Sequence, residues 1–226
     1  MKRGLITVQD APPPQWVAEQ HGSVLRQSVQ PTYGYRRSIQ VDPFPGYPVG
    51  VAELRRAVVV AARAFPLAHP VDVFALAHET LDHFNAQASR SFDYYGKRAP
   101  GAPAPWSGLI LVNGKRIPQH PAVVRYLGAH EYGHLVAMEI ADRIAGEVKD
   151  GSESQSLYPF YTALRGIPAE RGRWAEDPAE VFACDFRILV AGVEPEFWPH
   201  PGIEHPSRNR AIKAWWRKVL RGEIPS

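Results

Sequence analysis

The clearest pattern along the chain is the recurrence of apolar residues every three to four positions, which is typical of helices with one buried face. It is strongest over 121–145, where Pro121 suits the first helical position and Gly146 suits the position after the last turn. The same reasoning predicts three further helices, over 51–65, from Asp177-Pro178 to near Gly192, and over 207–221.

Strand patterns are fewer. The run 108–112 is continuously apolar apart from its first glycine and is followed by Asn113-Gly114, a turn-forming pair, so it is the best strand prediction in the chain. Residues 71–77 form a second β-capable run, for which a helix is the alternative. Residues 147–176 are polar and without a period, so they are predicted to be irregular.

Composition adds a proline-rich start and excludes several classes of protein. Many of the 22 prolines fall within residues 1–50, which predicts an extended N-terminal arm. The single cysteine excludes a disulfide framework and a multi-thiolate zinc site. A net charge of +3, from 26 basic and 23 acidic residues, does not indicate nucleic-acid binding. No signal peptide or membrane-length apolar run is evident, so a cytoplasmic protein is expected.

Chemistry is concentrated in the helix predicted over 121–145. It contains His130-Glu131-Tyr132-Gly133-His134, a His-Glu-x-x-His motif. Histidines four residues apart share one helical face and can bind the same metal ion, while Glu131, displaced by about 100°, can reach a metal-bound water instead. Glycine costs about 1 kcal/mol in a helix relative to alanine, so Gly133 indicates that another segment approaches closely there.

A third metal ligand is needed, and the sequence leaves more than one possibility. A metzincin is excluded because Ala137 and Ile140 stand where that class has glycine and histidine. The helix beginning at Asp177 offers Glu180, with Glu176 as an alternative. Glu180 also stands three residues after a potential N-cap, so helix capping is a competing use of the same carboxylate.

The two segments His130–His134 and Ala179–Ala183, with Phe186-Arg187 following and 46 residues between His134 and Glu180, resemble the catalytic domains of anthrax lethal factor and the Pro-Pro endopeptidases. The resemblance covers roughly residues 108–190. It implies a gluzincin-type zinc metalloendopeptidase, with His130, His134 and Glu180 as Zn²⁺ ligands and Glu131 as general base.

The fold class expected on this basis is α+β, a zincin-like domain with a small mixed sheet, an active-site helix and a second ligand-bearing helix. Its expected organisation is an arm over 1–50, the metallopeptidase domain over 51–206 and a docked basic amphipathic helix over 207–226. Strand 108–112 is expected to be the edge strand along which an extended peptide or protein substrate binds. The alternative function is an inactive zincin-fold protein that binds a protein or a nucleic acid.

The chain departs from this family at two positions. The family has a tyrosine seven residues before the third ligand, where it can stabilise the oxyanion; here the residue is Arg173, so Tyr158, Tyr161 and Arg173 are the candidates for that role. The family also has a carboxylate four residues after the ligand, where this chain has Cys184. Asp177 or Asp185 is expected to orient a metal-bound imidazole.

Overall fold

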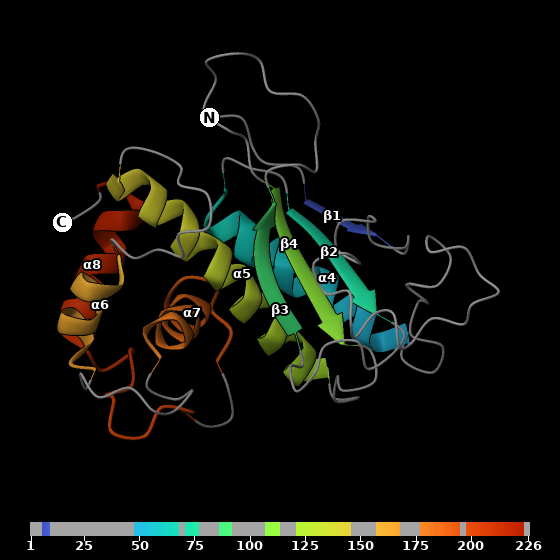
Figure 1. Cartoon of the computed structure of the whole chain (residues 1–226). Coiled ribbons are helices and arrows are strands. Elements are labelled where there is room, and N and C mark those ends of the chain that lie inside the picture. The colour runs from blue at the N-terminus through green and yellow to red at the C-terminus, as the bar shows by residue number, and fades with distance from the viewer. Residues whose placement is uncertain are drawn as a thin grey trace, which may run out of the picture.

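The computed structural model describes residues 6–9, 48–67, 71–76, 86–91, 107–113, 121–145, 157–167, 177–194 and 198–223 (Figure 1). Most of the predicted N-terminal arm lies outside these residues. The helices within them are α4 (Pro48–Ala64), α5 (Pro121–Ala145), α6 (Tyr158–Arg165), α7 (Pro178–Leu189) and α8 (Arg210–Leu220). No helix of this described part is both long enough and apolar enough to cross a membrane.

Four short strands lie beside α4 and α5 in the order β1-β2-β4-β3 (Figure 1). They are β1 (Ile6–Gln9), β2 (Val71–Leu76), β3 (Ala86–Ser91) and β4 (Ser107–Asn113). β1, β2 and β4 are parallel, with Val71 opposite Gly108, and β3 runs antiparallel to β4, with Ala88 opposite Ile110. The expected edge strand, 108–112, is therefore an inner strand, and the two edge strands of the described sheet are β1 and β3.

The predicted fold class, an α+β zincin-like domain organised on a small sheet, is wrong. The described part of the chain is predominantly helical. Its core is made mainly by side chains of the helices, and the strand residues among its buried members are Val71, Ala86 and Ile110. The prediction erred because it followed the family resemblance, whereas the apolar periodicity of the chain itself is mainly helical.

Aromatic side chains from three helices make the part of the core nearest the C-terminus. Trp215 and Trp216 of α8 pack on Phe182 of α7, with ring centroids 6.1 and 5.1 Å apart, and Tyr161 of α6 lies 5.6 Å from Trp215. Ile212 and Val219 are buried on the same face of α8. The apolar stripe read from the sequence is thus a core face that holds α8 and α6 against α7.

Candidate metal centre

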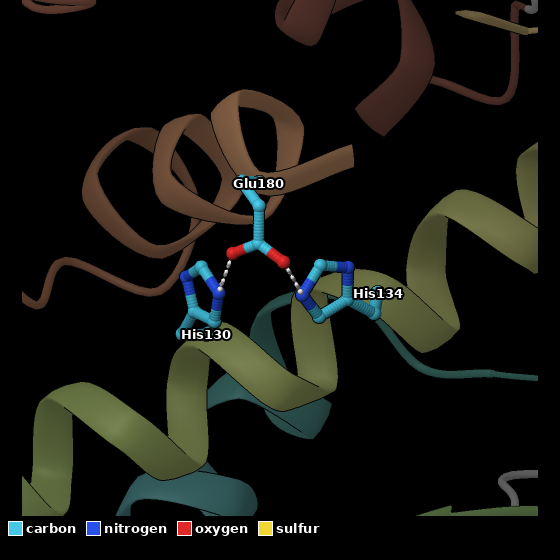
Figure 2. A group of neighbouring side chains, drawn as sticks. All are labelled: His130, His134 and Glu180. Carbon is cyan, nitrogen blue, oxygen red and sulfur yellow. Dashed lines mark hydrogen bonds and ion pairs between the residues drawn. The ribbon is translucent and has the colours of Figure 1, made fainter. Parts of the chain in front are cut away.

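Helix α5 supplies two of the three side chains that converge in the structure. His130 and His134 are one turn apart, so their imidazoles project from the same face, and their rings lie edge to face with centroids 4.9 Å apart. Both rings turn Nε2 toward α7 (Figure 2). His130 is only 4% exposed, so this pair is held inside the protein rather than on its surface.

Helix α7 supplies the third side chain from its first turn. The Asp177 carboxylate accepts a hydrogen bond from the Ala179 backbone N–H at 2.8 Å and so caps the helix. Glu180 then points across to α5, with Oε2 2.9 Å from Nε2 of His130 and Oε1 3.5 Å from Nε2 of His134 (Figure 2). The three donor atoms of the group lie within 4.8 Å of one another.

A close approach of the two helices makes this convergence possible. A Cβ atom on Gly133 would lie 2.9 Å from Cα of Ala183 and 3.1 Å from its carbonyl oxygen. Any side chain at 133 would therefore separate α5 from α7 between the two histidines and Glu180. The expectation that something approaches closely at Gly133 is confirmed, and the approaching segment is the backbone of α7.

Burial keeps both histidines neutral. It lowers the pKa of His130 well below its usual value, helped by the positive charge of Arg187 and by His200. Burial also lowers the pKa of His134 to about 4, with a further decrease from His130 and opposing contributions from Glu180 and Asp177. The neutral imidazole is the form of histidine that binds metal ions.

Glu131 lies beside the group but projects in another direction. It is 5% exposed, and burial together with the nearby Glu180 carboxylate raises its pKa to about 8, while a hydrogen bond from the backbone of Ala88 in β3 opposes the increase. The two negative charges repel each other, so the site favours a positive charge nearby. A bound cation would lower the pKa of Glu131 and leave it ionised.

The three candidates for stabilising the oxyanion, Tyr158, Tyr161 and Arg173, do not lie together at the candidate site in the described part of the chain. Tyr161 is fully buried, and its hydroxyl donates to Asp185, so the structure places it in the core. Tyr158 is the first residue of α6 and packs half-buried against the same core. Arg173 lies outside the described residues, as does Glu176, the alternative third ligand.

The two aspartates expected to orient an imidazole have other partners. Asp177 caps α7, and Asp185 forms a fully buried ion pair with Arg165, whose Nε lies 2.7 Å from Oδ2. The side chain found next to a ring nitrogen is Cys184, whose sulfur lies 3.5 Å from Nδ1 of His130. It is completely buried, and it contacts the site where the family has a carboxylate.

Sequence reasoning missed two further residues behind His130. The Tyr126 ring is stacked on the His130 ring, 6.0 Å away and inclined by 4°, and the Arg187 guanidinium lies 3.5 Å from the centre of the Tyr126 ring. Tyr126 is one turn before His130 on α5, so helical spacing could have indicated this contact. Arg187 was noted only as part of the family resemblance, and its contact with Tyr126 depends on the packing of α7 against α5, which has no local signal in the sequence.

The donor set fits a zinc ion. Two imidazole nitrogens and one carboxylate oxygen are the protein ligands of one class of catalytic zinc site, in which a fourth position stays open for water or substrate. Ligands at tetrahedral zinc are roughly 3.3 Å from one another, which follows from metal–ligand bonds of about 2.0 Å. The contacts of 2.9 and 3.5 Å are made by different oxygens of Glu180, and one donor atom from each of the three residues lies within 4.8 Å of the others, a spacing that a metal ion could draw together.

Comparison with known proteins offers no relative on which to base a function: no family model, curated protein or solved structure matches the chain. Any function must therefore be argued from the residues of the site.

Proposed function

We propose that this chain is a zinc-dependent endopeptidase. The observation that carries the proposal is the convergence of His130, His134 and Glu180, with the buried carboxylate of Glu131 beside them. This arrangement combines a ligand set that leaves an open position with an acid–base group one residue from a ligand. If two histidines and Glu180 had come together by chance, there would be no reason for a further buried carboxylate, that of Glu131, to lie beside them.

His130, His134 and Glu180 would hold the metal ion through Nε2, Nε2 and a carboxylate oxygen. When bound, zinc supplies Lewis acidity, which polarises a carbonyl and lowers the pKa of a coordinated water. The neutral state of both imidazoles means that loading does not have to displace protons from cationic histidines.

Glu131 would move the proton. Its carboxylate takes a proton from the attacking water and returns it to the amine that leaves when the peptide bond breaks. The hydrogen bond from the Ala88 backbone holds the carboxylate against β3 and favours its ionised form. A buried base whose pKa is shifted by its surroundings is typical of an acid–base catalyst.

The edge strand β3 is the proposed platform for an extended peptide. Ala88 directs a backbone N–H toward Glu131, which is on α5, so this side of β3 faces the site rather than β4. A substrate that pairs with this edge would pass directly in front of Glu131. The substrate class that follows is a protein or peptide in an extended conformation.

The test compares two glutamine variants of the same helix. Glu131→Gln should retain one zinc per chain but lose at least a hundredfold in the cleavage rate of a proteome-derived peptide library. Glu139→Gln is the matched control, because Glu139 is also buried on α5 but pairs with Arg143 at 2.8 Å. It should retain both zinc and cleavage. Equal cleavage by wild type and Glu131→Gln would refute the mechanism.

A second candidate is a zinc-holding interaction protein without hydrolytic activity. The exposed face of α8 favours it, because Arg210, Arg217 and Lys218 lie on the side opposite the buried tryptophans and would suit an acidic partner. Stoichiometric zinc with no cleavage of any peptide in the library would support this candidate over the peptidase.

A further inference from the structure

The thiol of Cys184 occupies a special position relative to the candidate metal centre. It lies one turn after Glu180 on α7, is completely buried, and has its sulfur 3.5 Å from Nδ1 of His130. The other ring nitrogen of His130, Nε2, lies 2.9 Å from Glu180. One imidazole is therefore held between a thiol and a carboxylate, both supplied by the same helix.

The metal-free arrangement fixes which nitrogen carries the proton. An ionised carboxylate only accepts hydrogen bonds, so the short contact with Glu180 favours the tautomer in which Nε2 of His130 carries the hydrogen. A neutral imidazole has only one N–H, so Nδ1 is then an acceptor. The Cys184 thiol satisfies Nδ1 by donating its S–H, which a carboxylate at position 184 would not do when ionised.

Metal binding reverses these roles. Nε2 must then offer its lone pair to the metal ion, so the imidazole proton moves to Nδ1 by exchange with solvent. The sulfur has lone pairs to accept Nδ1–H, and the thiol keeps its own hydrogen by rotating about the Cβ–Sγ bond. No proton is gained or lost by the His130–Cys184 pair, and both states leave Nδ1 with a partner.

We propose that Cys184 is a positioning residue for His130 whose thiol serves both tautomers, donating to Nδ1 in the metal-free protein and accepting from Nδ1–H in the metal-bound protein. The proposal rests on the proposed zinc site but not on peptide hydrolysis. A thiol is a weaker acceptor than a carboxylate, so the site gives up metal more readily than one with an acid at this position. The residue thus makes metal loading reversible.

Neighbouring side chains hold the sulfur in place. The Tyr126 hydroxyl donates to the Cys184 sulfur, and the Tyr126 ring is stacked on His130, so one residue contacts both members of the pair. The Arg187 guanidinium lies over the Tyr126 ring, 3.5 Å from its centre. Its positive charge acts on Cys184 as well, so an acidic residue introduced at 184 would have a counter-charge nearby.

The experiment measures zinc affinity by competition with a chromophoric chelator, and the His130 tautomer by ¹⁵N NMR of the metal-free protein. Wild type should show Nε2–H. Cys184→Asp should tighten zinc binding about tenfold, because a carboxylate accepts Nδ1–H more strongly than sulfur does, while Cys184→Ala should weaken binding by about ten- to a hundredfold. Tyr126→Phe should weaken it less than Cys184→Ala does.

Ile188→Val is the control, because it removes one buried methyl group from the same helix, away from the site. It should leave zinc affinity unchanged. The proposal is overturned if wild type shows Nδ1–H without metal, or if Cys184→Ala binds zinc as Ile188→Val does. If Cys184→Ala does not fold, Cys184→Asp tests the proposal instead, because its zinc affinity is expected to increase rather than decrease. If wild type binds no zinc, the proposed function fails, and the metal-free tautomer still tests the thiol.

Discussion

Replacement of Gly133 by alanine is the most direct test of how the two ligand-bearing helices depend on each other. The new Cβ atom would lie 2.9 Å from Cα of Ala183 and 3.1 Å from its carbonyl oxygen, both of them backbone atoms. Carbon atoms in good contact are about 3.5–4.0 Å apart, so α7 would have to retreat by about 0.6–1 Å. The retreat occurs one turn from Glu180 and moves it away from His130 and His134.

Two opposing effects set the change in stability. Alanine is about 1 kcal/mol better than glycine within a helix, whereas overpacking of a tight contact costs about 1–3 kcal/mol. The free energy of unfolding of Gly133→Ala should therefore fall by about 0–2 kcal/mol. Zinc affinity should fall more clearly, on the order of tenfold or about 1.4 kcal/mol, because the displacement acts on the ligand geometry itself.

Gly128→Ala is the matched control, since it makes the same change on the same helix. Its Cβ would lie 3.0 Å from Cδ1 of Leu54 and 3.1 Å from Cβ of Ala57, which crowds α4 instead of α7. Urea unfolding in the presence of a chelator measures stability, and chelator competition measures zinc affinity. Gly128→Ala should lose stability with unchanged zinc affinity. Wild-type affinity in Gly133→Ala, or an equal loss in Gly128→Ala, would contradict the reasoning.

Two further predictions concern the core and the pH dependence. Tyr161→Phe should lower the free energy of unfolding by about 1–2 kcal/mol, because Asp185 loses a buried hydrogen-bond donor. Its zinc content should be unchanged. A loss of cleavage without a loss of stability would instead indicate that Tyr161 acts in catalysis. The contribution of His134 to the stability of the metal-free protein should fall by up to about 3 kcal/mol between pH 6.5 and 4, because its folded-state pKa is lowered to about 4 and the unfolded state binds the proton first; the difference between wild type and His134→Gln separates it from the opposite contribution of Glu131. Urea unfolding against pH checks this, and His134→Gln should flatten the curve.

Local signals explain which parts of the site could be predicted. The helix expected over 121–145 is observed as Pro121–Ala145, because a proline suited to the first turn, a long apolar stripe and a following glycine all act within one segment. Helical geometry alone then places His130 and His134 on one face. Asp177-Pro178 similarly marks the start of α7, where Asp177 caps the helix.

The parts that were missed depend on contacts between distant segments. β3 has the sequence Ala-Gln-Ala-Ser-Arg-Ser, which has no alternation of large apolar residues, so its strand conformation comes from pairing with β4. Helix α6 has only eight residues and lies in a stretch predicted to be irregular. It is held by the bond from Tyr161 to Asp185 and by the ion pair of Arg165 with the same aspartate, both across 20 or more residues.

Glu180 could cap its own helix or face the two histidines, and only the packing of α5 against α7 determines which way its carboxylate points. Its spacing from Asp177 suits a capping box, and the same carboxylate suits a metal ligand, so the sequence alone left both uses open. In the structure Asp177 accepts the Ala179 N–H, and both oxygens of Glu180 face the histidines. That orientation requires α5 and α7 to approach as closely as the missing side chain of Gly133 permits. The residue that permits this orientation of Glu180 is therefore on the other helix, 47 positions away, and has no side chain of its own.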